Sequence, residues 1–457
     1  MPVLNFSKMF GLRIVLLLGA MAIAACGGGT IATSSLPAPA PPNPMPSPKI
    51  QHVVIIVQEN RSFNDLFYGF PGAHTADHGY DSHGRRIELQ PIGLETTWDL
   101  DHSSYSFFSA CNGTGSYPGT DCRMNGFNKE YVGCGHSHYP PCPIEHPQYA
   151  YVPHEETKPY FDIAKQFVLG DRMFASNFDA SSFISHQYII AAQANSAVNY
   201  PRNSWGCEGG PGDTIGTVTQ ARTLYGSYIR TCFENETLGD ELDKAGIDWG
   251  FYAAYYSPGY INLWSAYQAI KHIYYGPDWH KDVLPNTTFF DDVKNGKMRA
   301  VSWITPTCAN SDHAGCGSNT GPSWVASLVN AVGKSKYWNA TAIFVFWDDY
   351  GGWYDDVPPQ LVDYDGLGMR LPLLIVSPYA KKGYVSHVHY EHGSILKFVE
   401  DLWNLPRLAA SDTRANSPAF DCFDFTQPPR RFVPIAAPHG ESYFRNQPPD
   451  PRAPDQE

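Results

Sequence analysis

Short runs of apolar and β-branched residues recur along the chain, and each is bounded by Gly, Pro or Asp. The runs lack the alternation of apolar and polar positions that is typical of a strand with one face in water. Continuous apolar runs of this length predict strands that are buried on both faces of a sheet. The predicted strands are His52–Val57, Phe167–Leu169, Ile247–Ala253, Ala300–Ile304, Ala342–Trp347 and Leu371–Val376.

Segments in which apolar residues return at helical spacing lie between several of these runs. They predict helices at Tyr160–Gln166, Phe183–Ala194, Trp324–Val332 and Ser394–Trp403. Alternation of strands and helices predicts an α/β fold with a mostly parallel central sheet and helices on both faces. In such sheets, functional residues gather in the loops that follow the carboxyl ends of the strands.

The first residues of the chain have the pattern of an export signal. The apolar stretch Ile14–Ala25 follows Lys8 and Arg13 and is too short to span a bilayer, which predicts a signal peptide at residues 1–25. The sequence Ala24-Ala25-Cys26-Gly27 resembles a bacterial lipobox, whose cysteine is lipidated and becomes the mature N-terminus. An ordinary signal peptide with an incidental Cys26 is the alternative.

A proline-rich stretch follows at residues 26–48 and predicts an extended spacer. We expect the folded domain at residues 49–432 and a C-terminal tail at residues 433–457. This organisation predicts a lipoprotein of the periplasm or cell surface that touches the membrane only through its lipid anchor. Without the lipid, the protein would be periplasmic or secreted.

Composition and charge narrow the classes of partner. A chain of 457 residues is long enough to bury a large core. Its 40 Gly and 38 Pro indicate long loops between the elements. The chain also includes 32 Lys+Arg against 45 Asp+Glu, for a net charge of −13. Lys and Arg supply most contacts to phosphate backbones, so this balance argues against a nucleic-acid partner.

Cysteine spacing agrees with export. Eight of the ten cysteines fall in four near couples, Cys111 with Cys122, Cys134 with Cys142, Cys207 with Cys232, and Cys308 with Cys316. Four local disulfides are expected in an oxidising compartment, and Cys422 is left over as a buried thiol. The four cysteines within residues 78–154 could instead pair differently or hold a metal. That segment shows little periodicity, and we expect it to be a disulfide-pinned loop insertion near the functional site.

Carboxylates follow two of the predicted strands. Glu59 and Asn60 come directly after the first strand, and Asp348 and Asp349 come directly after Ala342–Trp347. Adjacent buried carboxylates repel one another unless they share a cation or a proton. These four residues form an all-oxygen set that suits a hard divalent ion. The alternative is a pair of solvated loops in which one Asp caps a helix.

Both blocks resemble the motifs of a known family. Glu59-Asn60-Arg61-Ser62-Phe63 and Asp348-Asp349-x-Gly-Gly-x-Tyr-Asp are similar to the bacterial phosphoesterase family that includes phosphatidylcholine-type phospholipases C and secreted acid phosphatases. The resemblance runs from about Lys49 to Phe432. It implies an alkaline-phosphatase-like α/β sandwich and one divalent metal ion bound by Glu59, Asn60, Asp348 and Asp349. The phospholipase members more often read Asp-Glu-His-Gly-Gly, so the Asp-Asp pair resembles the acid phosphatase branch.

The resemblance also implies a serine nucleophile. Asp179-Ala180-Ser181-Ser182-Phe183 precedes a predicted helix and is similar to the family's block in which a hydroxyl residue stands before Phe. Ser182 is the candidate, with Ser181 as runner-up. A serine hydroxyl is a weak nucleophile at neutral pH, so Ser182 is also expected to be a metal ligand. The alternative role for Ser182 is a helix N-cap.

Three histidines resemble the family's phosphate-contacting residues, and these are His102, His272 and His313. His186, His387 and His392 each neighbour a motif without matching a family position. The aromatic stretch Trp249–Tyr256, with Tyr260, Trp264 and Tyr267, is expected either to pack in the core or to line a choline or acyl pocket.

Together these features predict an exported, metal-dependent phosphoester hydrolase that resembles an acid phosphatase and acts on phosphomonoesters through Ser182. A phospholipase C that cleaves phosphatidylcholine-type lipids is one alternative. A non-enzymatic surface-binding lipoprotein is another. A sulfatase is excluded because the chain has no Cys/Ser-x-Pro-x-Arg block.

Overall fold

The apolar runs assemble into one mixed sheet in the computed structural model, which describes residues 49–136, 140–201, 204–257, 260–450 and 452. Side chains are described for all of these residues except 255–263. The signal peptide at 1–25, the spacer at 26–48 and the lipidation site Cys26 lie outside the described residues. Among the described residues, no helix is long and apolar enough to cross a membrane.

The sheet contains all six predicted strands. Its order is β11 (Tyr260–Leu263), β10 (Trp249–Ser257), β13 (Val301–Ile304), β1 (His52–Gln58), β14 (Thr341–Trp347), β15 (Arg370–Val376), β6 (Val168–Phe174) and β16 (Tyr384–Ser386), with β12 (Val283–Pro285) beside β10 and β17 (Tyr390–Glu391) beside β6. Strands β10, β13, β1 and β14 are parallel neighbours. Strand β15 runs antiparallel to both β14 and β6, and β11 runs antiparallel to β10. The mostly parallel sheet predicted from the sequence is confirmed.

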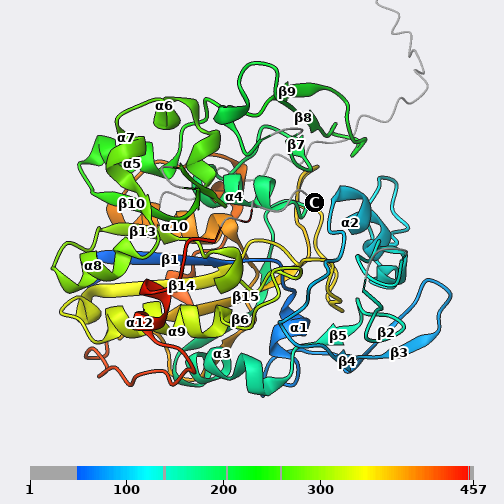
Figure 1. Ribbon diagram of the computed structural model, residues 1–457, viewed down its shortest axis with the longest axis horizontal. Coiled ribbons are helices and arrows are strands. Elements are labelled where there is room, and N and C mark those ends of the chain that lie inside the picture. The colour runs from blue at the N-terminus through cyan, green and yellow to red at the C-terminus, as the bar shows by residue number, and fades with distance from the viewer. Residues whose placement is uncertain (1–48, 137–139, 202–203, 258–259, 451, 453–457) are drawn as a thin grey trace, which may run out of the picture. The chain divides into compact units, whose positions relative to one another are not determined.

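Helices cover both faces of the sheet, as predicted (Figure 1). One layer contains α4 (Ser182–Ala191), α5 (Leu238–Ala245) and α10 (His392–Trp403), and α4 packs against both other helices. The opposite layer contains α3 (His154–Gln166), α8 (Thr288–Lys294) and α9 (Gly321–Gly333), with α9 between the other two. Helix α4 ends before the predicted Ala194 because Ala192 takes a left-handed conformation that caps it.

Loop-rich segments surround this sandwich. The described part of the insertion at residues 78–154 holds short elements, which are β2 (His78–Tyr80), β3 (Arg86–Glu88), β4 (Gln90–Pro91), α2 (Ser104–Cys111), a 3₁₀ helix at Phe127–Lys129 and β5 (Ala150–Tyr151). A second small sheet consists of β7 (Ala197–Val198), β8 (Thr214–Thr217) and β9 (Tyr228–Arg230). The remaining helices are α1 (Phe63–Phe67), α6 (Lys271–Tyr274), α7 (Asp278–Asp282), α11 (Ala410–Arg414) and α12 (Glu441–Arg445).

The cysteines pair as their spacing suggested. The structure contains the disulfides Cys111–Cys122, Cys134–Cys142, Cys207–Cys232 and Cys308–Cys316. Pairing of the first four removes the alternative in which they hold a metal. Cys422 is the remaining thiol of the described residues, and burial raises its pKa to about 12.

The segment expected to be a tail packs on the domain. The side chain of Phe444, on α12, is buried, and its ring centroid lies 5.2 Å from that of Trp324 on α9. Asn330 exchanges two hydrogen bonds with the backbone of Ile435, which is also buried. The described part of residues 433–457 therefore continues the domain beyond the boundary drawn at residue 432.

The aromatic stretch supplies core residues rather than an open pocket. Trp249, Tyr252 and Tyr267 are buried within the hydrophobic core. Trp264 is buried as well and stacks on the ring of His313, at 5.7 Å between centroids. The other aromatic residues of the stretch, within residues 255–263, have side chains that lie outside the described ones.

A carboxyl beside α4 makes stability depend on pH. Burial raises the pKa of Asp365 to about 7, although the hydroxyl of Tyr188 donates to the carboxyl at 3.0 Å. The folded chain therefore keeps a proton that the unfolded chain releases near its ordinary pKa of about 4, so stability present at pH 4 is lost as the pH rises to 7.

We expect the Asp365→Asn variant to lose less stability than the wild type between these pH values. The two proteins should differ by roughly 1–3 kcal/mol in the free energy of unfolding that each loses, measured by guanidinium titration at about pH 4 and pH 7.5. Equal losses in the two proteins would mean that Asp365 is ionised in the fold throughout this range.

Candidate active site

Two parallel strands bring the predicted carboxylates together. Strands β1 and β14 pair in register up to Gln58 and Trp347, so the residues that follow them meet at one edge of the sheet. The backbone N–H of Asn60 donates to Oδ1 of Asp348 at 3.0 Å, and the N–H of Asp349 donates to the same oxygen at 2.8 Å. The loops after β1 and β14 are therefore joined directly by hydrogen bonds.

The turn after β14 depends on its two glycines. Asn60 has a left-handed backbone, with a φ of 58°. Gly351 has a φ of 59°, and a Cβ on it would lie 2.2 Å from the carbonyl oxygen of Asn60. A Cβ on Gly352 would lie 2.5 Å from that of Leu100. The glycines let these loops pack against each other, and this packing accounts for the Gly pair without an approaching ligand.

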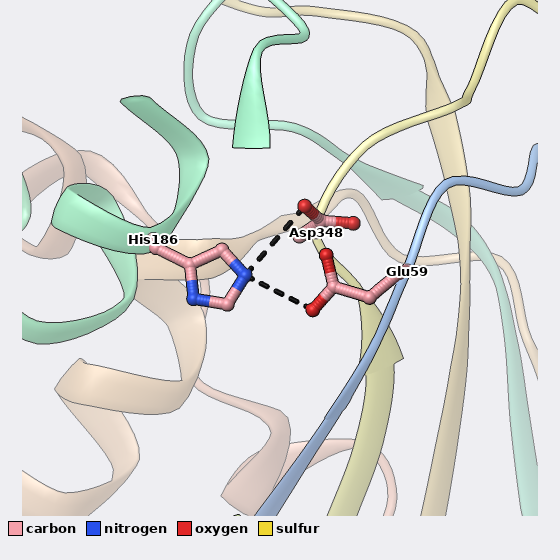
Figure 2. A group of neighbouring side chains, drawn as sticks. All are labelled: Glu59, His186 and Asp348. Atoms are coloured by element: carbon pink, nitrogen blue, oxygen red, sulfur yellow. Dashed lines mark hydrogen bonds and ion pairs between the residues drawn. The ribbon is translucent and has the colours of Figure 1, made fainter. Parts of the chain in front are cut away.

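A buried cluster of three potential metal ligands forms at this edge. Nε2 of His186 lies 3.1 Å from Oε1 of Glu59 and 3.6 Å from Oδ2 of Asp348. Figure 2 shows the imidazole of His186 turned toward both carboxylates, and all three side chains are at most 1% exposed. One ligand atom from each residue lies within 4.8 Å of the others. His186 comes from α4, one helical turn after Ser182.

The cluster fits a divalent cation. Oδ2 of Asp348 is buried and accepts no hydrogen bond from the described residues, although it faces Glu59 and His186. Buried carboxylates without such partners are costly unless a cation balances them. The set differs from the all-oxygen set expected from the sequence, because it adds an imidazole nitrogen. Imidazole and carboxylate ligands together suit transition-metal ions as well as hard ones.

Ser182 lies at the first position of α4 and faces the carboxylates. Its Oγ is 3.3 Å from Oδ2 of Asp349 and 3.5 Å from Oδ1 of Asn60. Ser181 is the N-cap residue instead, and its hydroxyl donates to the carbonyl of Asn199 at 2.8 Å. Of the two serines, Ser182 therefore joins the site. Its position at the start of a helix also favours a negatively charged group.

His102 contacts the cluster through Asn60. The carbonyl oxygen of Leu100 accepts a hydrogen bond from Nδ1–H of His102 at 2.7 Å. Nε2 then accepts a hydrogen bond from Nδ2 of Asn60 at 2.8 Å, which requires the neutral form of the imidazole. Asn60 thus links His102 to Ser182.

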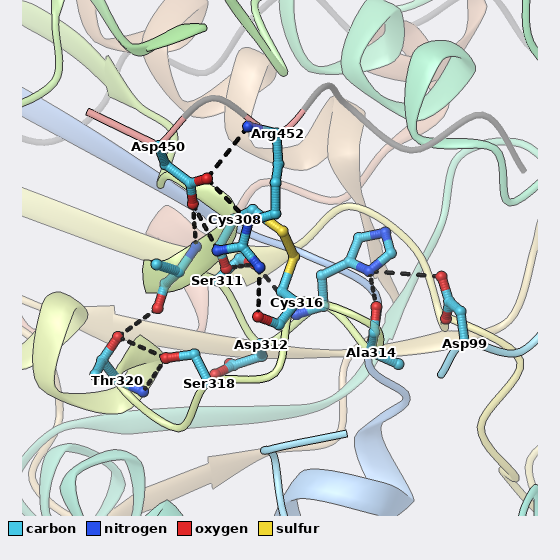
Figure 3. Close-up of a disulfide and its surroundings, with 12 residues drawn as sticks. Asp99, Cys308, Ser311, Asp312, Ala314, Cys316, Ser318, Thr320, Asp450 and Arg452 are labelled. Atoms are coloured by element: carbon cyan, nitrogen blue, oxygen red, sulfur yellow. Dashed lines mark hydrogen bonds and ion pairs between the residues drawn. A yellow bond between two sulfur atoms is a disulfide. The ribbon is translucent and has the colours of Figure 1, made fainter. Parts of the chain in front are cut away.

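His313 lies beside His102, with 6.2 Å between ring centroids. Its Nδ1 contacts the carbonyl of Ala314 and lies 3.6 Å from Oδ2 of Asp99. Figure 3 shows Asp99 and Ala314 next to the disulfide Cys308–Cys316, which closes the loop that carries His313.

Residues near the end of the chain bind the loop that carries His313. Oδ2 of Asp450 accepts a hydrogen bond from the N–H of Ala309 at 2.9 Å, and Nη1 of Arg452 donates to the carbonyl of Cys316 at 2.5 Å (Figure 3). Arg452 and Asp450 also form an ion pair at 2.7 Å. The expected tail therefore supports a loop of the site.

The structure does not bring His272 to the other predicted site residues. Its Nε2 lies 2.8 Å from Asp240, its Nδ1 lies 3.9 Å from Glu234, and its side chain is 39% exposed. These contacts place His272 on the surface around α6, where it joins ion pairs, and it contacts none of the other predicted site residues. His387 also lies apart and pairs with Asp171 at 2.9 Å.

Parallel substitutions should separate these histidines. We expect His102→Ala to lower kcat by about 10²–10³-fold, because His102 positions Asn60 and faces the reacting group. The variant His272→Ala should keep wild-type kcat, because its lost contacts are surface ion pairs of little energetic value. Steady-state kinetics of both folded variants on one phosphoester would check this. A comparable loss in His272→Ala would return that residue to the site.

One further histidine lies behind the cluster. His392 begins α10, and its Nε2 lies 3.4 Å from the carbonyl oxygen of Trp347. Burial lowers its pKa to about 4, so the ring is neutral at ordinary pH. Its position beside β14 gives it a packing role next to Asp348.

Buried polar residues fix the loops around the site. Arg61 pairs with Asp65 at 3.1 Å and donates from Nε to the carbonyl of Asp312 at 2.8 Å. Asp312 accepts hydrogen bonds from Tyr160 at 2.7 Å and from Trp347 at 3.0 Å. Burial nevertheless raises the pKa of Asp312 to about 6. This network ties the residue before His313 to the ends of β1 and β14.

Comparison with known proteins identifies relatives over most of the chain. Non-hemolytic phospholipase C of Burkholderia pseudomallei is 24% identical over 418 residues, which cover 78% of this chain and 55% of that protein. The chain thus spans about half the length of this relative. Phospholipase C B of Mycobacterium tuberculosis is 23% identical over 442 residues, covering 84% of this chain and 80% of that protein.

A solved structure described as a protein in the alkaline phosphatase superfamily from Vibrio parahaemolyticus is 10% identical, with a TM-score of 0.38, and covers 84% of this chain and 72% of that chain. The model of the Phosphoesterase family matches residues 50–406. Because this match covers well over half of the 457 residues, the chain belongs to the Phosphoesterase family.

Proposed function

We propose that the protein is a metal-dependent phosphoester hydrolase that acts on phosphomonoesters, with Ser182 as the nucleophile. The observation that carries this proposal is the position of the Ser182 hydroxyl. It lies at the N-terminus of α4, within 3.5 Å of Asn60 and Asp349, and one helical turn from the metal-ligand candidate His186. Membership of the Phosphoesterase family gives the reaction class.

Glu59, His186 and Asp348 would hold the metal, which supplies positive charge that favours the alkoxide form of a nearby serine. Asp349 contributes a second function. Its Oδ2 accepts a hydrogen bond from the Ser182 hydroxyl at 3.3 Å, so it can take the proton as the hydroxyl oxygen attacks phosphorus. The bond between phosphorus and the ester oxygen breaks, the departing alcohol takes up the proton held by Asp349, and Ser182 carries the phosphoryl group.

The histidines and the helix act on the charge of the phosphoryl group. The N-terminus of α4 and the protonated side chain of His313 can donate hydrogen bonds to the phosphoryl oxygens where this charge develops. His102 acts through Asn60, to which its neutral ring is hydrogen-bonded. In the second half of the reaction, water attacks phosphorus, the bond to Ser182 Oγ breaks, and the serine regains its proton. Inorganic phosphate is released.

The monoester preference rests on the second motif. Asp348-Asp349 resembles the acid phosphatase branch, whereas the relatives found by comparison are phospholipases C. Hydrolysis of phosphatidylcholine-type lipids is therefore the second candidate function. We also propose that the protein is exported and anchored by a lipid on Cys26, on the basis of the sequence before residue 49.

A substrate panel tests the proposal. The chain from Lys49 onward should release phosphate from a chromogenic phosphomonoester, and a chelator should stop the reaction until metal is restored. Cleavage of a choline phosphodiester at a higher kcat/KM than the monoester would favour the phospholipase. Failure to cleave either ester with any divalent metal would contradict the hydrolase and favour a binding lipoprotein.

A further inference from the structure

A pocket lined by tyrosines borders the candidate active site. Its volume is about 490 Å³, and its wall includes Tyr105, Tyr131, Tyr200, Tyr225, Tyr228 and Asp101. The five tyrosines are 40–56% exposed. Exposed aromatic side chains are normally scattered singly, and a group of them around one concavity marks a binding site.

Three of the rings form a continuous surface. The centroids of Tyr105 and Tyr225 are 6.3 Å apart, and those of Tyr225 and Tyr228 are 6.1 Å apart with the rings within 21° of parallel. Nδ2 of Asn199 donates to the hydroxyl of Tyr225 at 2.7 Å, which fixes the ring between its neighbours. These contacts hold the rings in place, so the wall presents an ordered aromatic surface to the pocket.

Two connections place this pocket beside Ser182. Asp101, in the pocket wall, directly precedes His102. The backbone carbonyl of Asn199, which also lines the pocket, accepts a hydrogen bond from the hydroxyl of Ser181. Asp179 reinforces this connection, because its two oxygens accept the N–H groups of Ser181 and Asn199 at 2.9 and 2.6 Å. An ester whose phosphorus lies at Ser182 can extend its alcohol portion into this pocket.

The chemistry of the wall restricts that alcohol. None of the described lining residues is Lys or Arg, and Asp101 is the charged residue among them. A second phosphate or a carboxylate on the alcohol would therefore meet an acidic wall without a partner. Oδ1 of Asp101 already accepts the N–H of Ser103 at 2.9 Å, so this carboxylate serves the turn before α2.

We propose that the tyrosine pocket binds the leaving group of the ester and selects alcohols that carry a flat, uncharged ring. Tyrosine faces stack on such rings, and the polar groups of the wall can bond to their edges. An aryl alcohol and a nucleoside share this chemistry. The inference rests on the proposed function, since it assigns the specificity of the same site.

Kinetics on paired substrates test the pocket. The variant Tyr105→Ala removes an exposed ring from α2 and replaces it with a good helix former. We expect kcat/KM to fall about tenfold for adenosine 5′-monophosphate and for phenyl phosphate, and to stay unchanged for glycerol phosphate. Tyr105→Phe should retain the wild-type values because the ring remains. Tyr80→Ala is the matched control, since Tyr80 is 48% exposed and lies on β2 outside the pocket wall.

The two ring esters distinguish the sources of the ring. A loss for one of them alone identifies that ring class as the ligand, and a loss for both supports the general form of the proposal. Equal losses for glycerol phosphate would overturn it. A larger loss for phosphocholine than for either ring ester would also overturn it, because the pocket would then select a cation.

A binding measurement separates this inference from the proposed function. Adenosine has no phosphate, so its binding does not require hydrolysis. Calorimetric titration should detect adenosine binding to the wild type and to Tyr80→Ala, and a roughly tenfold weaker affinity for Tyr105→Ala. Binding of adenosine without hydrolysis of any ester would support the pocket and contradict the proposed hydrolase activity. Hydrolysis with equal adenosine affinity in all three proteins would refute the pocket.

Discussion

Replacement of Ser182 by alanine is expected to lower kcat by at least about 10⁴-fold, because the variant has no nucleophile. The fold should survive. The contacts of the hydroxyl with Asp349 and Asn60 are long, at 3.3 Å and 3.5 Å, and the N-cap residue of α4 is Ser181. Alanine is also a strong helix former, so the first turn of the helix should persist.

Ser181→Ala is the matched control for this loss. It removes a hydroxyl from the adjacent residue, whose partner is the carbonyl of Asn199. We expect this variant to keep activity within about tenfold of the wild type, because a hydrogen bond between neutral groups contributes only about 1 kcal/mol. Rates of phosphate release and thermal unfolding of both variants give the comparison. An inactive Ser181→Ala beside an active Ser182→Ala would exchange their roles.

The variant Asp348→Asn is expected to lose its bound metal and nearly all activity. Oδ1 of Asp348 accepts two backbone hydrogen bonds, and an asparagine oxygen can keep both. Oδ2 faces Glu59 and His186, and in the variant an uncharged NH₂ group would occupy that place. An amide nitrogen with its hydrogens is not a metal ligand. We expect a loss of activity of about 10³-fold or more, since the metal is needed to activate the serine.

Metal content per chain, measured by elemental analysis after dialysis, checks the cause of the loss. Asp365→Asn makes the same chemical change outside the cluster and should retain the metal. Excess metal in the assay should restore Asp348→Asn only in part. Full metal content in an inactive Asp348→Asn would show that this carboxylate serves the reaction in another way, and full activity would remove it from the site.

The sheet and the residues Glu59, Asp348 and Ser182 could be predicted because each is marked by a pattern within its own segment of the sequence. The run before Glu59 and the run before Asp348 are continuously apolar, so each identified a strand whose end carries a carboxylate. Parallel pairing of β1 and β14 then brought these ends together, as expected for an α/β sheet. The motif at Ser182 indicated a serine that the structure places within 3.5 Å of Asn60 and Asp349. His186 had a usable signal, because four residues of helix place it on the same side as Ser182.

Contacts between segments far apart in sequence were not predictable in this way. His272 has a motif-like context, but its place on an exposed helix depends on Asp240 and Glu234. The pocket joins Tyr105 from the insertion with Tyr225 and Tyr228 near β9, and these loops have no periodicity to reveal their pairing. The hydrogen bonds of Asp450 and Arg452 to the loop of His313 were not predictable either, because they also join segments that are far apart in sequence.

Detection of a phosphoryl group on Ser182 tests directly whether this serine is the nucleophile. The metal-loaded protein would be mixed with a phosphomonoester, quenched in acid within the first turnovers and digested for peptide mass spectrometry. We expect a peptide that contains Ser182 and is heavier by one phosphoryl group, and we expect this added mass to be absent after chelation and absent from Ser182→Ala. Steady hydrolysis without any modified peptide, or the modification on another residue, would contradict this role of Ser182.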